Sequence, residues 1–515
     1  MPVKQKYKYK KVLMKYLIMI FAILLNILIG TTYAQSNLNT EKCIPCEKLI
    51  TLKIPDVKIT EAIAITAGSS HCKISGIIGK EIKFELLLPV DWNGIYIMGG
   101  GGGFVGTVQN MASSTVNEGY ATSGTDTGHD DKNSVGAGWA LNNMERQLNF
   151  GHLAVHRTAE VSKAIIGSYY GSSPKYSYFT GCSRGGGQAM MEAQRYPDDF
   201  DGIVAGAPAF DWPALAAEFV QNTQAVYPSR LTEPVINKEH IRMLQEAILK
   251  QCDMLDGVKD GILNNPTMCK FDFTSLPKCP GDVPGKDCFT TSQINAVKKI
   301  YEGVAIGNGI AYPGFPFGQE NQPDGWQAWI TGPYEGMQKA GYPTLQAYFG
   351  IEVFKYLIMQ DPDWNYLTYD FKGHEKEIRY ASAYLDATST DYSGFKNRKG
   401  KIIFWHGWND PALSAFATID HYNAVKANDP ETGNYMRLFL LPGVLHCGGG
   451  DGPAQVDWIA LIRNWVEKNN APERVIASKI VDGKEVMSRP IFPYPGEAVY
   501  KGKDDTNKES SFVLK

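Results

Sequence analysis

The sequence predicts an α/β fold, a mostly parallel sheet covered by helices on both faces, with a large lid inserted between core strands. Short apolar runs alternate with helical patterns over residues 82–206, and the same alternation resumes near residue 401. With 515 residues, of which 43% are hydrophobic, the chain can bury a large core. This composition excludes a disordered or collagen-like protein.

The first half of the pattern contains four strand-like runs and two helical segments. Each run is short, apolar and closed by glycine, proline or asparagine, as buried strands with tight exits are. The second run leads into five consecutive glycines, Gly99 to Gly103. We expect strands at 82–88, 95–98, 176–180 and 202–206, and helices at 152–169 and 184–195. Such alternation places the strands parallel to one another.

The second half of the pattern adds strands at 402–405 and 436–441 and helices at 417–426 and 456–466. Between the halves, residues 211–398 contain four cysteines and many prolines, glycines and aromatic residues. A chain that leaves and rejoins one sheet keeps its ends together, which favours a lid over an independent neighbouring domain. The core would then comprise 35–210 and 399–500, followed by a charged, flexible tail at 501–515.

Residues 1–34 have the pattern of a secretory signal peptide. Six lysines precede an apolar run of 13 residues, and Thr32 and Ala34 suit cleavage before Gln35. A membrane anchor needs about 20 apolar residues, so we expect a secreted or periplasmic protein with no stable anchor after cleavage. The remaining chain has 45 basic and 54 acidic residues, a mildly acidic balance that indicates no nucleic-acid partner.

The nine cysteines of an exported protein are disulfide candidates, and the odd number leaves one unpaired. Cys43 and Cys46 lie close to the mature N-terminus. We expect one of them to bond to Cys72 while the other stays free. A zinc site built on the spacing of Cys43 and Cys46 is the alternative, but no second such pair accompanies it.

The pentapeptide from Gly181 to Gly185 fits the pattern G-x-S-x-G, between an expected strand and an expected helix. A sharp turn from strand to helix forces its serine into a strained backbone and exposes the hydroxyl above the sheet. A chance glycine-rich turn is the alternative, since the pentapeptide alone is common. Its position between the two elements favours Ser183 as a nucleophile.

A serine nucleophile needs a general base and an acid that orients the base. In folds of this type they follow in the chain order Ser, Asp, His, at the carboxyl ends of later strands. Asp410 follows the strand at 402–405 and His446 follows the strand at 436–441. We therefore predict Asp410 as the orienting acid and His446 as the base. His406 competes for the base role, but it precedes the acid and lies at the strand exit itself, as a structural histidine would.

Cysteines flank the predicted nucleophile and base. Cys182 immediately precedes Ser183, and Cys447 immediately follows His446. A bond between these cysteines would hold their Cα atoms within about 7 Å. It would therefore bring the serine and the histidine together by covalent geometry.

Two backbone amides are needed to stabilise the oxyanion of an acyl-transfer reaction. The amide of Arg184 directly follows the nucleophile. The other donor is expected in the loop Gly99 to Gly103, where we favour Gly102. A phosphate-binding loop is the alternative for these glycines, but no G-K-[ST] ending follows them.

The chain resembles a known family at these residues. The motifs at issue are Gly181-Cys182-Ser183, Asp410, His446-Cys447, Thr125 to His129, Glu192 to Ile203, and His406-Gly407-Trp408. They are similar to those of the tannase and feruloyl esterase family, which also contains esterases that cleave mono(hydroxyethyl) terephthalate. The resemblance covers most of the mature chain and implies an α/β-hydrolase core with a large lid. One departure is Gly187, where family members often have arginine.

The resemblance also implies a calcium site in the lid. The matching positions are Asp253, Asp256 and Asp260 with the backbone oxygens of Val258 and Ile262. Three carboxylates on one turn-rich loop repel one another unless a hard cation is present, although the spacing is not that of an EF-hand. From the residues alone, a solvated acidic turn is an equal alternative. Two disulfides would staple this region, Cys252 to Cys269 and Cys279 to Cys288.

The activity implied is that of a secreted serine carboxylesterase acting on small or plant-polymer-derived esters of phenolic or other aromatic acids. The sequence leaves ferulate, gallate and terephthalate open as the acid. A secreted serine peptidase with the same triad and a non-catalytic carbohydrate-binding protein are the alternatives from other classes.

Overall fold

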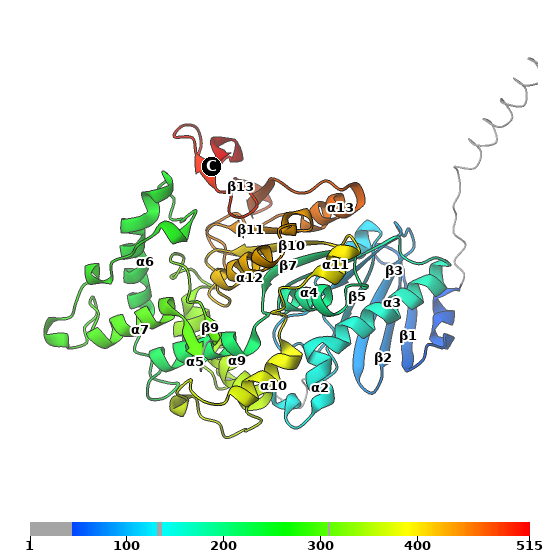
Figure 1. The fold of residues 1–515 in the computed structure, drawn as a ribbon, viewed down its shortest axis with the longest axis horizontal. Coiled ribbons are helices and arrows are strands. Elements are labelled where there is room, and N and C mark those ends of the chain that lie inside the picture. The colour runs from blue at the N-terminus through cyan, green and yellow to red at the C-terminus, as the bar shows by residue number, and fades with distance from the viewer. Residues whose placement is uncertain (1–43, 131–135, 307–309) are drawn as a thin grey trace, which may run out of the picture.

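A nine-stranded sheet forms the centre of the molecule. The computed structural model describes residues 44–130, 136–306 and 310–515, so the expected signal peptide and Cys43 lie outside the described residues. The strand order is β1-β2-β3-β5-β4-β6-β7-β10-β11. The six strands from β5 to β11 pair in parallel, whereas β1, β2 and β3 pair antiparallel at one edge (Figure 1).

The strands have these bounds: β1 Val57–Ile65, β2 His71–Ile78, β3 Ile82–Pro89, β4 Ile95–Gly99, β5 Ala121–Thr125, β6 Tyr176–Ser183, β7 Gly202–Pro208, β10 Lys401–Gly407 and β11 Met436–Leu441. All six strands expected from apolar runs are therefore present, but β3, which was expected to be parallel to the others, pairs antiparallel with both of its neighbours. The sequence reasoning missed β1, β2 and β5. Strands β1 and β2 alternate buried and partly exposed residues, and β5 is a short run rich in threonine, serine and glycine, so none is a continuous apolar run.

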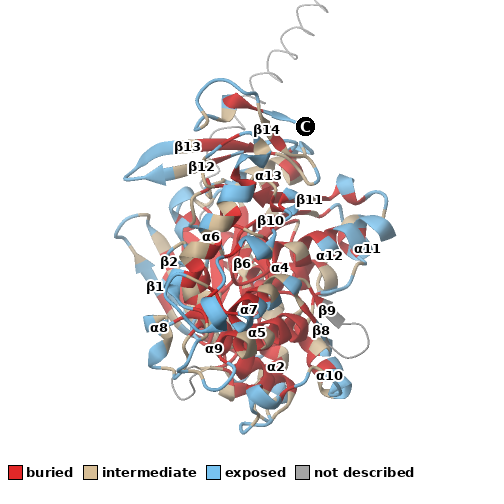
Figure 2. Cartoon of the chain, turned by 90° about the vertical axis from the view of Figure 1, so that its left-hand side faces the viewer, coloured by how far each residue is buried: buried red, intermediate tan, exposed pale blue. Residues whose placement is uncertain are grey.

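Helices cover both faces of the sheet. The expected helices correspond to α3 Ala154–Tyr170, α4 Arg184–Arg195, α12 Ala415–Asn428 and α13 Trp458–Lys468. Successive strand residues point to opposite faces, so Phe179 joins the apolar cluster under α3, α4 and α12 while Tyr178 joins the cluster under α13. Buried residues accordingly run through the parallel strands in Figure 2, as expected for a parallel sheet.

Residues 211–398 form a helical insertion between β7 and β10, which are adjacent in the sheet. Part of it, including Leu215 on α5, packs into the core cluster, while α6 and α7 form a second apolar cluster of their own. The insertion is thus anchored on the core and extends away from it (Figure 1). Its elements are α5 Trp212–Val226, α6 Lys238–Cys252, α7 Thr291–Glu302, β8 Val304–Ile306, β9 Ile310–Tyr312, α8 Glu335–Gln338, α9 Leu345–Val353, α10 Glu375–Leu385 and α11 Ser393–Asn397.

The C-terminal segment is ordered, which corrects the expectation of a flexible tail at 501–515. After the hairpin of β12 Val475–Val481 and β13 Lys484–Ile491, strand β14 Ala498–Tyr500 pairs with β15 Phe512–Leu514. Phe512 is buried and lies under the Arg489 guanidinium, 4.2 Å from ring to cation. The charge of this segment suggested disorder, but one buried aromatic residue and a strand pairing tie its end to the protein.

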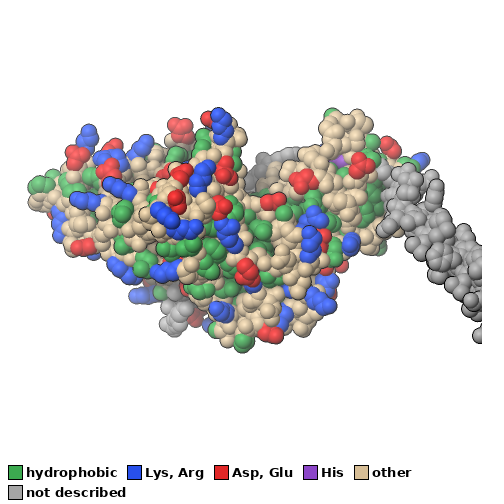
Figure 3. Space-filling view, turned by 90° about the horizontal axis from the view of Figure 1, so that it is seen from above, with side chains coloured by type: hydrophobic (Ala, Val, Ile, Leu, Met, Phe, Trp, Pro, Cys, Tyr) green, Lys and Arg blue, Asp and Glu red, His purple; other side chains and the backbone are tan. Residues whose placement is uncertain are grey.

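Acidic and basic side chains are interspersed on the face seen in Figure 3. Among the described residues, no helix has the length and apolarity that crossing a membrane requires.

We expect Phe512→Ala to release the C-terminal segment, because the ring fills an apolar site between Arg489 and Tyr500. Limited proteolysis followed by mass spectrometry should then detect cleavage within 501–515 that the native protein resists. Val513→Ala is the matched control, because the neighbouring side chain is exposed. Equal protease resistance of the Phe512 variant and the native protein would contradict this account of the tail.

Candidate active site

Ser183 occupies a strained turn between β6 and α4. Its backbone angles are φ 63° and ψ −125°, a conformation that costs free energy for a residue with a side chain. The turn is tight because a Cβ on Gly181 would lie 2.5 Å from the carbonyl carbon of Gly185. The glycines of the motif therefore permit the turn that exposes the serine, as the sequence predicts.

The next two glycines let α4 approach the end of β7. A Cβ on Gly186 would lie 2.2 Å from the oxygen of Gly206, and one on Gly187 would lie 1.9 Å from the oxygen of Ala209. No side chain fits at Gly187 in this packing. Glycine stands here, where family members often have arginine, because α4 packs closely against the backbone after β7.

His446 and Asp410 form an imidazole–carboxylate pair at the carboxyl ends of β11 and β10. The distance from Nδ1 of His446 to Oδ2 of Asp410 is 2.7 Å, and the Asp410 side chain is fully buried. The carboxylate also accepts hydrogen bonds from the amides of Ala412 and Leu413 at 2.8 and 2.9 Å. Burial alone would raise the pKa of Asp410, but the neighbouring imidazoles of His446 and His406 hold it well below its usual range.

This pairing fixes the role of each ring nitrogen. A carboxylate can accept but not donate, so Nδ1 of His446 carries the hydrogen and Nε2 is left to take a proton. That is the tautomer required of a base acting on Ser183.

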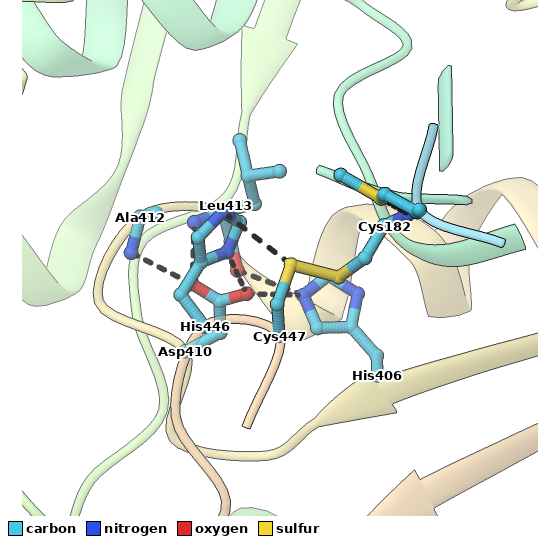
Figure 4. Close-up of a disulfide and its surroundings, with 8 residues drawn as sticks. Cys182, His406, Asp410, Ala412, Leu413, His446 and Cys447 are labelled. Atoms are coloured by element: carbon cyan, nitrogen blue, oxygen red, sulfur yellow. Dashed lines mark hydrogen bonds and ion pairs between the residues drawn. A yellow bond between two sulfur atoms is a disulfide. The ribbon is translucent and has the colours of Figure 1, made fainter. Parts of the chain in front are cut away.

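The disulfide Cys182–Cys447 joins the nucleophile turn to the loop of the base, with 5.9 Å between the Cα atoms. Figure 4 shows this bond beside His446 and Asp410. The predicted pairing is therefore confirmed. The other expected bonds are also present: Cys252–Cys269, Cys279–Cys288 and, at the N-terminal end, Cys46–Cys72.

The glycine loop after β4 lies beside the nucleophile, but it corrects one expectation. The amide of Gly102 donates to Oε1 of Gln109 at 2.8 Å, and the amide of Gly101 donates to Oε1 of Gln188 at 3.1 Å. Both amides therefore bond within the protein and are not available to an oxyanion. Gly103, one residue further on, lines the same cleft as Ser183 and is the better second oxyanion donor. The two glutamines that anchor the loop had no recognisable signal in the sequence.

The side chain of Arg184 stabilises one wall of the cleft. Its guanidinium is buried between the rings of Phe150 and Trp212, 4.4 and 5.4 Å from their centroids. It donates to the carbonyls of Phe150 and Gly151, in a π-helical turn ahead of α3. Burial lowers the pKa of Arg184 to about 9. Its backbone amide, at the start of α4, needs no intrahelical acceptor and remains suited to an oxyanion.

Aromatic residues of the insertion line the cleft beside Ser183 and His446. Trp329 meets the ring of His446 edge-on, with 5.0 Å between centroids. The walls that surround Ser183 and His446 are apolar, formed by Ala209, Trp212, Leu215, Phe219, Trp329, Phe349, Ala412 and Leu413. Their number and type suit the burial of a flat, apolar group.

Comparison with known proteins identifies the family. The family model of tannase and feruloyl esterase matches residues 68–514. The chain belongs to the tannase and feruloyl esterase family. It is 31% identical to a mono(2-hydroxyethyl) terephthalate hydrolase of Piscinibacter sakaiensis, over 86% of this chain and 84% of the relative. It is 32% identical to a probable feruloyl esterase of Arthroderma benhamiae, over 83% of this chain and 81% of the relative.

The fold of this family member is also that of solved esterases. The structure of feruloyl esterase B from Aspergillus oryzae matches with a TM-score of 0.81 at 24% identity, covering 91% of this chain and 99% of that one. Tannin acyl hydrolase from Aspergillus niger matches with a TM-score of 0.68 at 19% identity, covering 90% and 92%. The α/β-hydrolase fold is thereby established. Family membership makes the protein a carboxylic ester hydrolase.

The expected calcium ligands lie together on one loop of the insertion. Asp253, Asp256 and Asp260 accept hydrogen bonds from amides within the loop, and Asp260 also pairs with Arg489 at 2.9 Å. Burial, and secondarily the charges of Asp260 and Asp253, raise the pKa of Asp256 to about 6. Carboxylate and carbonyl oxygens are the donors that calcium prefers, but among the described residues the oxygens of these three carboxylates do not gather within 4.8 Å of one another.

Removal of Cys182–Cys447 should impair activity as well as stability, because the bond joins the loops of nucleophile and base. In the chain-entropy model a loop of 265 residues is worth about 5 kcal/mol. We expect Cys182→Ser/Cys447→Ser to lower both Tm and kcat, by calorimetry and ester hydrolysis.

Cys279→Ser/Cys288→Ser is the matched control for this experiment. It opens a loop of 9 residues in the insertion, worth about 2.5 kcal/mol in the same model. It should lower Tm less and leave kcat unchanged. Equal kcat in the two double variants would contradict a role for Cys182–Cys447 in assembling the site.

Proposed function

We propose that the protein is a secreted serine esterase that hydrolyses esters of aromatic acids through an acyl-enzyme. The observation that supports it best is the cleft in which Ser183 and His446 face Trp329 and other aromatic side chains. The named esterases among the relatives support the same substrate class. The acyl ring would lie among these aromatic residues, and the ester carbonyl would lie at Ser183.

The reaction follows from the roles of the triad. Ser183 Oγ attacks the carbonyl carbon while Nε2 of His446 takes its proton, and Asp410 stabilises the imidazolium that forms. The amides of Arg184 and Gly103 hold the oxyanion. When the tetrahedral intermediate collapses, His446 returns the proton to the leaving alcohol. Water then repeats the sequence on the acyl-enzyme and releases the acid.

The lining of the cleft favours neutral acyl groups. Arg184 is the one arginine or lysine among the described residues that line the cleft, and its guanidinium is enclosed by Phe150 and Trp212 and bonded to backbone carbonyls. A carboxylate on the far end of the acyl ring would be buried without a partner, which is costly. Ferulate-type acids therefore suit this cleft better than terephthalate, and gallate, with three hydroxyl groups to satisfy, lies between them.

A panel of esters tests this proposal. We expect methyl ferulate to be hydrolysed with a kcat/KM at least about a hundredfold above that of mono(2-hydroxyethyl) terephthalate. Ser183→Ala should lower kcat by about 10⁴-fold or more with an unchanged Tm. A fluorophosphonate should label the native protein and not this variant.

The same assay separates the alternatives. Hydrolysis of a peptide series in place of the esters would favour a peptidase. Failure of the fluorophosphonate to label Ser183 would favour a carbohydrate-binding protein without catalysis. Unchanged ester hydrolysis by Ser183→Ala would refute the assignment of the nucleophile.

Export is supported by the disulfides, since such bonds form and persist in oxidising compartments. We propose cleavage after Ala34, with release into the periplasm or the medium. N-terminal sequencing of protein recovered from these fractions should then begin at Gln35.

Calcium is proposed as a structural ion of the insertion, held by Asp253, Asp256, Asp260 and the backbone oxygens of Val258 and Ile262. Its charge would offset the repulsion among three carboxylates. Chelation of the native protein with EGTA should lower Tm by several degrees, and calcium should restore it.

Two variants make the calcium test specific. Asp256→Asn should have a low Tm that EGTA does not change further. Asp287→Asn, at an exposed position of the same insertion, should respond to EGTA as the native protein does. A chelator titration that leaves the native Tm unchanged would count against the site.

A further inference from the structure

A second imidazole contacts the catalytic carboxylate. His406 is the penultimate residue of β10, and its side chain is buried on all sides. Its Nε2 lies 3.3 Å from Oδ2 of Asp410, the same oxygen that receives His446. Figure 4 draws both histidines beside Asp410, together with Ala412 and Leu413, whose amides bond to its carboxylate.

The partners of His406 determine its tautomer. Nε2 lies 3.0 Å from the carbonyl oxygen of Leu413, which can only accept, so this nitrogen carries a hydrogen. The same N–H faces Asp410, and we assign it as a donor shared by the two oxygens. Nδ1 lies 2.9 Å from Oγ1 of Thr418 on α12 and accepts its hydroxyl hydrogen.

Both oxygens of the Asp410 carboxylate are engaged. Oδ1 accepts the two amides of Ala412 and Leu413, and Oδ2 accepts from His446 and lies in ion-pair contact with Nε2 of His406. With Oδ1 held by the backbone and Oδ2 contacted from the strand side, the carboxylate is restrained from rotating away from His446. A buried carboxylate with these partners also stays ionised.

The backbone around His406 reinforces this arrangement. A Cβ on Gly407 would lie 2.4 Å from the oxygen of Val444, so the glycine lets the loop of the base pack directly on the strand. The amide of Asn409 donates to that same oxygen at 3.1 Å. The acid loop and the base loop are therefore joined within a few residues of His406.

We propose that His406 is a positioning residue for Asp410: its N–H fixes the carboxylate in the orientation that holds the productive tautomer of His446. It does not touch substrate, because its side chain is enclosed and lies outside the cleft lining. The inference rests on the triad of the proposed function. It assigns a role to a histidine that the sequence indicated as merely structural.

The effect on the pH profile of the reaction has a definite sign. Loss of the His406 N–H leaves more negative charge on Oδ2 for the imidazolium, so the acid limb of the pH profile should move to higher pH. Tyr312 on β9 is the further titratable group that senses the charge of Asp410. Burial first, and then the charges of Asp211 and Asp410, raise the pKa of Tyr312 far above its usual value, so it stays neutral throughout.

Three variants test the proposal. His406→Met removes the donor at similar size, His406→Gln keeps an N–H near the position of Nε2, and His421→Met is the control. His421 is an equally buried histidine on α12 whose Nε2 lies 2.9 Å from the hydroxyl of Tyr392, away from the triad. Each variant is assayed for kcat, KM, pH dependence of kcat/KM, and Tm.

We expect His406→Met to lower kcat about tenfold to a hundredfold, to leave KM within about twofold, and to raise the kinetic pKa by several tenths. His406→Gln should recover most of kcat. His421→Met should lower Tm without changing the pH profile. An unchanged kcat and pH profile for His406→Met, with a Tm loss like that of the control, would overturn the proposal and leave His406 a packing residue.

The rate of Ser183 labelling by a fluorophosphonate provides a readout that does not depend on the ester. It should fall in His406→Met in parallel with kcat. If no aromatic ester is hydrolysed but labelling still slows in this variant, the substrate proposal fails while the role of His406 stands. If labelling of the native protein fails, the triad itself is refuted.

Discussion

The active site depends on one covalent constraint, the bond between Cys182 and Cys447. Ser183 is part of a strained turn at the end of β6, while His446 lies in a loop beyond β11, three strands away in the sheet. Strands alone place both ends at the same edge but do not fix the distance between two loops. The disulfide joins the two loops directly, because one cysteine is adjacent to Ser183 and the other to His446. It also offsets part of the free energy that the strained serine costs.

Beside this disulfide, the carboxylate of Asp410 is buried away from solvent and bonded within the protein. Asp410 loses its water on burial, and three hydrogen bonds and the contact with His406 replace that water. The result is a carboxylate that stays charged without solvent and whose orientation is set by the backbone and by His406. The ring of His446 is oriented in turn, because its Nδ1 bonds to this fixed carboxylate. The orientation of Asp410 and His446 is therefore set by residues that do not contact the substrate.

The insertion contributes apolar side chains to the site, in contrast to the polar groups of the core. Helices α5 and α9 bring aromatic side chains over the triad, and Trp329 touches His446 itself. The insertion is held by the core cluster on one side and by its own cluster, two disulfides and the acidic loop on the other. The apolar lining of the cleft therefore lies directly beside the polar groups at Ser183. This arrangement suits an ester whose acyl part is an aromatic ring.

The sequence by itself predicted Ser183, Asp410 and His446 as a triad, the pairing of Cys182 with Cys447, five of the six parallel strands and helix α4, because each has a local signal. Continuous apolar runs indicate buried strands, and the order Ser, Asp, His with flanking cysteines indicates the site. Tertiary structure alone decided which glycine amide is free. Gly102 and Gly103 are alike in sequence, and it is the side chain of Gln109, seven residues further on, that accepts the amide of Gly102. It also decided the order of the C-terminal tail and the choice of Cys46 for Cys72, because long-range contacts set both of these, and composition does not record them.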